Sequence, residues 1–311
     1  MPDRPAPLLV RVLRDGVVES VHRGHVVVCR PDGSIVAALG DAHLPTYVRS
    51  AAKPFQALAT LELLADADVQ LDTDGLAIAC ASHVGTDMHQ IEAARLLAEA
   101  GLDEAALGCP SALPSDIPTL VAQRTPERLA HNCSGKHASF LLAHTSGGGD
   151  PARYLELDVP LQRRIRDHLA TVSGTEPTGP GVDGCGAPAW VLPLRGLAAA
   201  FARLAAATSG DLARIRTAMT ARPDLVGGER TNDCQLMRAD SRVVAKRGAE
   251  AVLGSGLGHR EPLGVAVKIA DGAARADGPV TAAVLEALGA VVPAELRRPP
   301  VLGGGRPHGY L

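Results

Sequence analysis

The segments with strand character lie at the two ends of the chain, and the segments with helical character lie between them. Alternating and β-branched runs separated by turn residues occupy residues 7–40, and similar runs return after Arg242 as RVVAK, EAVLG and LGVAVKIA. In the middle, apolar residues recur at helical spacing over residues 50–65, 89–100, 134–143, 160–172 and 197–208. We expect strands from both ends to join one antiparallel sheet, with helices packed on it and a helical lobe between them.

The composition is typical of a folded globular protein. The 311 residues are 46% hydrophobic and 21% charged, with a formal net charge of -3 and only three Phe, three Tyr and one Trp. Such a chain lacks the basic surface and the stacking aromatics that nucleic acids require, so no nucleic-acid partner is expected. We expect a single domain over residues 1–311, with its sheet in approximately 1–49 and 241–311 and its helices in approximately 50–240.

Neither a signal peptide nor a membrane-spanning segment is evident. The N-terminal residues have no apolar stretch of signal length, and no run of 18 apolar residues occurs. We therefore expect a cytoplasmic protein with no membrane partner. The six cysteines are sparse and irregularly spaced, so in a reducing compartment they are expected to be thiols or metal ligands rather than disulfides.

Lysine is unusually rare, since only four of the 31 cationic side chains are lysines. One of them, Lys53, follows Ser50 by three residues at the predicted start of a helix, where positions i and i+3 share a face. A buried, neutral Lys53 could accept the proton of the Ser50 hydroxyl, which is the chemistry of Ser-Lys acyl transfer. The alternative is that Ser50 caps the helix and Lys53 is solvated.

Three further stretches carry reactive side chains. CASH places Ser82 and His83 before a glycine turn, although Ser82 could simply cap the next helix. HNCSGKH and VDGCGAP together could hold a zinc ion through two thiolates and a His or an unusual neutral Lys, or Cys133 could act as a nucleophile with His137 as its base. Lys268 stands alone in the apolar run VAVKIA, where burial would push its amine toward neutrality unless it faces outward near an edge; Lys246 has the same ambiguity in a weaker context.

Five stretches in this order resemble the asparaginase II family, the rhizobial-type class 3 L-asparaginases, over nearly the whole chain. The stretches are YVRSAAKPFQ at 47–56, CASH at 80–83, HNCSGKHASFL at 131–141, VDGCGAPA at 182–189 and VKIADG at 267–272. The resemblance implies an α/β (α+β) fold like that of serine β-lactamases and penicillin-binding proteins. It also implies the hydrolysis of L-asparagine to L-aspartate and ammonia, and a homodimer.

The resemblance also implies roles for individual residues. Two Ser-Lys tandems would be Ser50 with Lys53 and Ser82 with Lys268, with Ser50 as the nucleophile and Ser82 as the second choice. A zinc site beside the substrate would use Cys133, Lys136 and Cys185. The substrate contacts would be Arg49, His137 and Asp183, where an Arg suits the α-carboxylate and an Asp suits the α-ammonium. Thr86 departs from the acidic residue that the family often has there.

Two other functions compete with this interpretation. A β-lactamase-like serine hydrolase shares the Ser-x-x-Lys start, but no S-D-N or K-T-G element accompanies it here. A zinc-dependent amino-acid-binding protein without turnover would bind asparagine and release no ammonia. The sequence leaves open whether glutamine is also a substrate, which serine attacks first and whether zinc is essential.

Overall fold

The computed structural model describes residues 5–311, and its main sheet combines strands from both ends of the chain. The strand order is β1-β2-β9-β8-β7, all neighbours are antiparallel, and β3 also pairs with β2. The six strands are β1 (Leu8–Arg14), β2 (Val17–Cys29), β3 (Ile35–Leu39), β7 (Val243–Gly248), β8 (Val252–Leu257) and β9 (Leu263–Ile269). The predicted α/β class and the joining of the terminal strands are thus confirmed.

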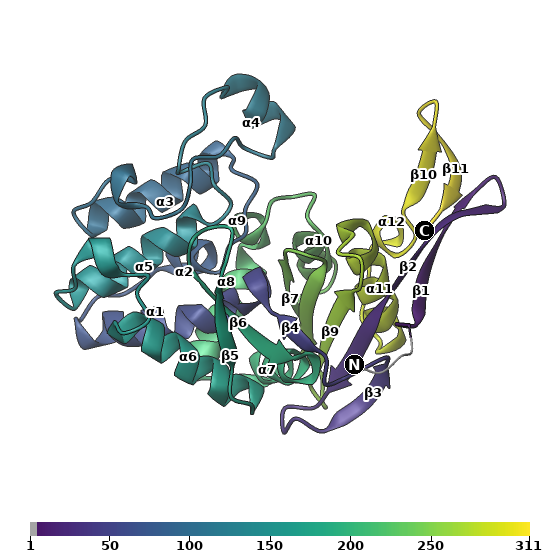
Figure 1. Cartoon of the computed structure of the whole chain (residues 1–311), viewed down its shortest axis with the longest axis horizontal. Helices are drawn as coiled ribbons and strands as arrows, with labels where there is room; N and C mark the ends of the chain where they lie inside the picture. Colours follow the sequence, from purple (N-terminus) through teal and green to yellow (C-terminus); the bar gives the residue numbers. More distant parts are fainter. Residues whose placement is uncertain (1–4) are drawn as a thin grey trace.

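Most helical elements lie between these two groups of strands along the sequence. In space, most of them form a lobe beside the main sheet (Figure 1). The described helices are η1 (Arg49–Ala52), α1 (Lys53–Asp66), α2 (Thr73–Ala79), α3 (Asp87–Glu99), η2 (Glu104–Ala106), α4 (Ile117–Ala122), α5 (Ser134–Ser146), η3 (Pro151–Arg153), α6 (Pro160–Ser173), α7 (Leu194–Ala206), α8 (Gly210–Ala221), α9 (Pro223–Val226), α10 (Asn232–Ala239), α11 (Ala274–Ala287) and α12 (Ala294–Arg297). None of the helices in residues 5–311 is long and apolar enough to cross a membrane.

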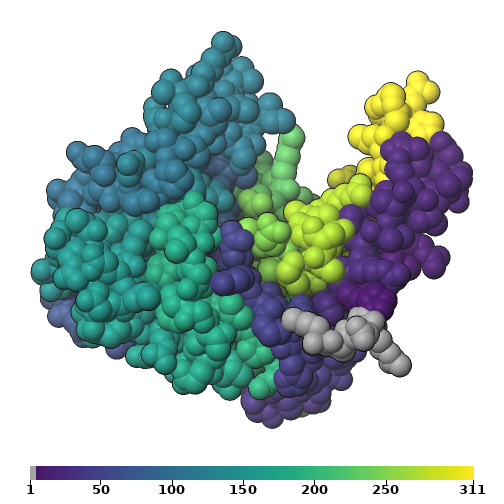
Figure 2. All heavy atoms as spheres, in the orientation of Figure 1, coloured from purple at the N-terminus to yellow at the C-terminus, as the bar shows by residue number. Residues whose placement is uncertain are grey.

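Two smaller sheets were not expected from the sequence. The strands β4 (Pro45–Tyr47), β6 (Pro188–Pro193) and β5 (Thr178–Val182) form a three-stranded sheet inside the helical part. The strands β10 (Pro300–Gly303) and β11 (Arg306–Tyr310) form a C-terminal hairpin where only a Gly- and Pro-rich tail was predicted. In Figure 2 this hairpin and the N-terminal strands form an arm that is separated by a wide notch from the helical mass around α4.

Helices α7 and α11 cover opposite faces of the main sheet. Gly264 of β9 faces α7, where an added Cβ would lie 1.9 Å from the Ala198 carbonyl oxygen. Val28, which pairs with Val265, lies on the other face and lines an apolar groove with Val280 of α11. The segment between the terminal strands therefore also supplies α7, which packs directly on the sheet.

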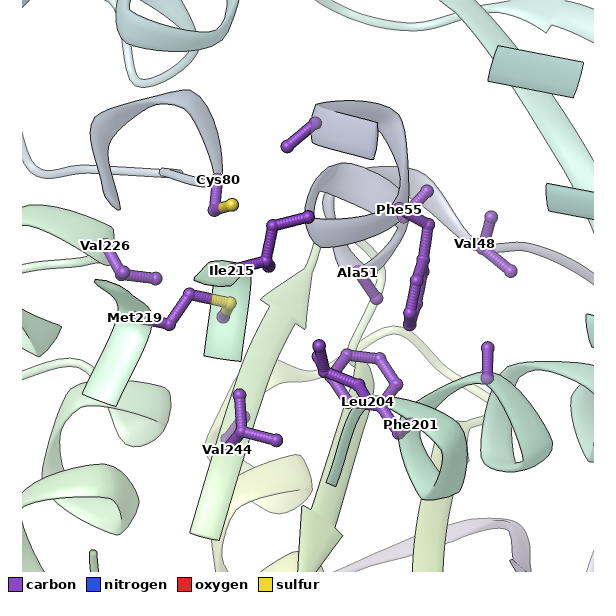
Figure 3. Close-up of a cluster of buried hydrophobic side chains, with 14 of the residues drawn as sticks. Val48, Ala51, Phe55, Cys80, Phe201, Leu204, Ile215, Met219, Val226 and Val244 are labelled. Carbon is purple, nitrogen blue, oxygen red and sulfur yellow. The ribbon is translucent and has the colours of Figure 1, made fainter. Parts of the chain in front are cut away.

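The start of α1 rests on a hydrophobic core, which Figure 3 shows in close-up. Ala51 and Phe55 are fully buried, and the Phe55 ring meets Phe201 of α7 edge to face with 5.2 Å between the ring centroids. Because these residues are four apart, they occupy one face of the helical segment, and Ser50 and Lys53 lie on other faces. The core thus fixes the orientation of the first Ser-Lys motif.

The close approach of β9 and α7 predicts a strong stability effect. Gly264→Ala would force a methyl group against helix backbone, which cannot move as a flexible side chain can. We expect a loss of ~2 kcal/mol or more in the free energy of unfolding, measured by chemical denaturation. Gly147→Ala is the matched control, because its nearest contact would be an ordinary 3.6 Å, and an equal loss in both variants would contradict this account of the packing.

Candidate active site

Ser50 lies at a sharp change of backbone direction between β4 and α1. Arg49, the residue before it, has a φ of +47°, a left-handed conformation that is uncommon for a residue with a side chain. The backbone of Gly248 in β7 packs against this turn, since an added Cβ there would lie 3.2 Å from both the Ala51 nitrogen and the Val48 carbonyl oxygen. Such strain is held in place by surrounding structure and is common at functional sites.

The Lys53 amine connects the helix to two other loops. Lys53 is only 1% exposed, and its Nζ donates to Ser82 Oγ at 3.0 Å and to Cys133 Sγ at 3.1 Å. It also donates to the carbonyl oxygen of Ala81. Within residues 5–311 no hydrogen bond joins Ser50 Oγ to this amine, although both residues line the same pocket. The structure therefore brings Lys53 to Ser82 more directly than to Ser50.

The loop that carries Ser82 is tied to the loop that carries Cys133 through His83. The backbone N–H of His83 donates to the Asn132 carbonyl oxygen at 3.1 Å, and Gly85 donates to His83 Nδ1. Because Nδ1 accepts, the proton lies on Nε2, which contacts Ser134 Oγ at 3.0 Å. Burial lowers the pKa of His83 well below its ordinary value, so the ring is neutral and positions the two loops.

Two thiols and an amine converge where α5 begins. Lys136 Nζ lies 3.1 Å from Cys185 Sγ, and Cys133, Lys136 and Cys185 are all buried. A hydrogen bond with Cys185 and the charges of Lys53 and Lys136 lower the pKa of Cys133 well below its usual value, although burial opposes this shift. Burial opposes the charge on Lys136, but the neighbouring Cys185 and Cys133 side chains outweigh it and raise the pKa of that amine.

His137 is buried as a neutral ring beside these groups. The Tyr154 hydroxyl accepts the Gly108 N–H at 2.7 Å and lies 2.5 Å from His137 Nδ1. The other ring nitrogen, Nε2, is buried without a partner among the described residues. Burial and the neighbouring Lys136 charge lower the pKa of His137 to about 3.

Arg49 and Asp183 form an ion pair at the same pocket. Arg49 Nη2 lies 2.7 Å from Asp183 Oδ1, and Nε donates to the same oxygen at 2.9 Å. Burial opposes ionisation of Asp183, but the Arg49 charge holds the pKa of the carboxyl below its usual value. One small pocket is lined by Arg49, Ser50, Lys53, Gln56, Lys136, Asp183 and Trp190.

The structure does not bring Lys268 to Ser82. Lys268 pairs with His25 across β2 and β9, and its Nζ donates to the carbonyl oxygens of Glu250 at 2.6 Å and Ile269 at 2.5 Å. Lys246 of β7 is instead the fully buried lysine near the site, 3.3 Å from the buried Asp233 carboxylate. Burial, together with the charges of Lys53 and Arg247, lowers the pKa of Lys246 to about 8 although Asp233 opposes this shift.

One weak sequence signal lies at Lys246. Lys246-Arg247-Gly248 differs from a K-T-G element in its middle residue, and Arg247 Nη2 donates to the Ser82 carbonyl oxygen at 3.0 Å. Gln56 and Trp190 were also missed, because no spacing rule places a glutamine or a tryptophan in a pocket.

The side chains of Cys133, Cys185 and Lys136 are a possible donor set for a soft or borderline metal ion. Thiolate sulfur and nitrogen are the ligands that Zn²⁺ prefers. The described part of the chain contains no group of three or more His, Cys, Asp or Glu side chains arranged for a metal, so the third donor here would be the lysine amine. The unpartnered His137 Nε2 lies beside this set, and its chemistry fits a metal-bound or substrate oxygen.

Comparisons with solved structures find matches at low sequence identity and with TM-scores below 0.5. Mglu in its native form is 14% identical with a TM-score of 0.43, over 82% of this chain and 61% of that chain. A β-lactamase from Mycobacterium bovis is 16% identical with a TM-score of 0.41, over 85% of this chain and 94% of that chain. This chain spans about three fifths of the Mglu chain's length.

Sequence comparison gives a more specific result. No protein with a curated function matches the chain significantly. The family model described as L-asparaginase II, however, matches residues 10–311, which include every candidate site residue discussed above. The chain therefore belongs to the L-asparaginase II family.

Proposed function

We propose that the protein is an L-asparaginase that hydrolyses L-asparagine to L-aspartate and ammonia through a Ser-Lys acyl-enzyme mechanism. The observation that carries the proposal is the pocket in which Ser50 and Lys53 lie together with the Arg49–Asp183 ion pair. Family membership supports the same class of reaction. A cytoplasmic location and a homodimer remain predictions that follow from the sequence and the resemblance.

The ion pair suits the head group of an amino acid. An α-carboxylate can replace Asp183 as the partner of Arg49, and an α-ammonium can replace Arg49 as the partner of Asp183. One internal ion pair is thus exchanged for two pairs with a zwitterion, which leaves neither charge unpaired. A neutral amide or a β-lactam without an ammonium group would leave Asp183 uncompensated, and this disfavours the β-lactamase-like alternative.

Ser50 is the proposed nucleophile. Its Oγ attacks the side-chain carbonyl carbon, and its proton passes to Lys53, one helical turn away, after Lys53 has given up a proton to neutral Lys246. The tetrahedral intermediate then expels ammonia, which takes up a proton, and leaves an aspartyl ester on Ser50. Water hydrolyses this ester to release aspartate. Ser82, whose hydroxyl accepts from Lys53 at 3.0 Å, would relay protons and is the second candidate for the attacking group.

Lys246 replaces Lys268 in the second tandem that we propose. Its amine is buried near the positive charge of Lys53, which favours the neutral form. Neutral Lys246 can take up a proton from the Ser82–Lys53 pair and return it to the leaving ammonia. Lys268 donates to two backbone carbonyl oxygens and is proposed to support β9 rather than catalysis.

We also propose that Cys133, Lys136 and Cys185 hold Zn²⁺. The metal, when bound, would supply a fixed positive charge that orients the substrate. Binding requires an unprotonated Lys136 amine, so zinc must displace the proton that the neighbouring Cys185 and Cys133 side chains stabilise there. We propose His137 as a substrate contact through Nε2, which is buried without a partner among residues 5–311.

Ser50→Ala is expected to lower the rate of ammonia release from L-asparagine by about 10³-fold or more, because the covalent step is lost. The assay measures ammonia from purified protein, with L-glutamine as a parallel substrate. Ser255→Ala is the matched control, since this buried hydroxyl on β8 has no partner within residues 5–311. A Ser50→Ala enzyme that keeps more than about a tenth of the wild-type rate would remove Ser50 from the nucleophile role.

Absence of ammonia release by the wild-type protein, with zinc present, would refute turnover. Asparagine binding under those conditions would then support the amino-acid-binding alternative, whereas binding and turnover together support the asparaginase.

The pH dependence tests the role of Lys246. The amine accepts a proton only when it is neutral, and its pKa of about 8 means that this fraction increases as pH rises through 8. The kcat/KM for asparagine is therefore expected to rise about tenfold per unit below that pH and to level off above it. Lys268→Met should leave this profile in place. A loss of the profile in Lys268→Met, or a flat wild-type profile from pH 6 to about 9, would contradict the assignment.

Metal content tests the zinc proposal without reference to activity. Wild-type protein purified without chelators is expected to contain about one equivalent of zinc, and Cys185→Ala much less, because a thiolate ligand is lost. Mass spectrometry of the metal in each purified sample gives the values. Cys234→Ala removes a buried thiol elsewhere and should keep the zinc. Equal zinc in both variants, or none in the wild type, would rule out this donor set.

A further inference from the structure

Two buried polar atoms at the candidate site have no hydrogen-bond partner in residues 5–311. Gln56 Oε1 and Trp190 Nε1 are inaccessible to solvent and unpaired among the described residues. Each residue is only 7% exposed, and both line the pocket that contains Arg49 and Ser50. Other buried unpaired atoms, such as Thr60 Oγ1 on the same helix, belong to residues outside this pocket lining.

Both residues are tied to the segment that carries the nucleophile. Gln56 stands three residues after Lys53 on α1, so it extends the same helix face by one turn. Trp190 lies on β6, and its carbonyl oxygen accepts the N–H of Val48 at 3.2 Å, two residues before Ser50. Their side chains therefore have fixed positions relative to Ser50.

An unpaired donor and an unpaired acceptor in one buried pocket are costly unless a ligand completes them. The indole nitrogen can only donate, and the Gln56 oxygen can only accept. A carboxamide offers the matching pair, because its oxygen accepts and its amino group donates. A carboxylate has oxygens alone, so it can pair with Trp190, but in this orientation of the Gln56 side chain it sets two acceptors against each other at Oε1.

We propose that Trp190 Nε1 and Gln56 Oε1 bind the side-chain carboxamide of asparagine, and that Gln56 distinguishes this amide from the carboxylate of aspartate. The inference rests on the proposed function and names two residues that specify its substrate. Arg49 and Asp183 hold the head group that substrate and product share. Discrimination must therefore come from the far end of the ligand, and Gln56 also disfavours retention of the product.

The test measures binding to Ser50→Ala protein, in which asparagine is not consumed. Isothermal titration calorimetry gives Kd for L-asparagine and L-aspartate, and emission from Trp190, the chain's one tryptophan, gives an independent signal. Adding Gln56→Met is expected to weaken asparagine binding about tenfold while leaving aspartate nearly unchanged. Adding Trp190→Phe should weaken both ligands. Thr60→Val, which removes an unpaired buried hydroxyl outside the pocket, should affect neither.

A second, conservative substitution distinguishes a lost contact with the ligand from a folding defect. Gln56→Glu keeps the side-chain shape and an acceptor oxygen, so it should retain a preference for asparagine over aspartate. Equal effects of Gln56→Met on the binding of both ligands, or no effect on either, would overturn this inference but not the proposed function. If Ser50→Ala protein binds no asparagine by either signal, the proposed function fails as well, so the two failures are distinguishable.

Discussion

The candidate site depends on the burial of three amines close together in a largely apolar interior. Lys53, Lys136 and Lys246 are each almost completely buried, and each has different partners. Lys53 donates to a hydroxyl, a cysteine sulfur and a backbone carbonyl oxygen, Lys136 donates to the sulfur of Cys185, and Lys246 pairs with a carboxylate. Burying a charge without such partners would cost a large part of the free energy of folding of a domain. The segments that carry Ser82, Cys133 and Cys185 must therefore pack against α1 and β7 before the interior is stable. Correct folding and the arrangement of the candidate site thus depend on the same contacts.

Arginine and lysine have separate tasks in this chain. Arginines form most of the exposed ion pairs, such as Arg14 with Glu19 and Arg153 with Glu156, where a permanent charge is harmless. Three of the four lysines are instead buried at the site, where an amine can lose its proton. Lys268 is the exception, and its amine is satisfied by backbone carbonyl oxygens. The scarcity of lysine was thus an informative feature of the sequence.

Much of this architecture was predictable because strand runs and short motifs are local properties. The joining of both termini in one sheet followed from apolar runs, and the proximity of Cys133, Lys136 and Cys185 agrees with their expected grouping. The choice between Lys246 and Lys268 was not predictable in this way, because both stand alone in apolar strands. Strand order and register decide which of them lies near the site, and these depend on contacts between distant segments.

The sheet that both termini build also affects when the protein can become active. Ser50 and Lys53 leave the ribosome early, but β7, β8 and β9 are made near the end of synthesis and pair with β2 through β9. Until then the N-terminal strands lack their central neighbour, and the buried amines lack the strand that carries Lys246 and packs beside Ser50. A nascent chain consequently contains the proposed nucleophile before the proposed site is assembled, and the site is completed only when the last strands have folded.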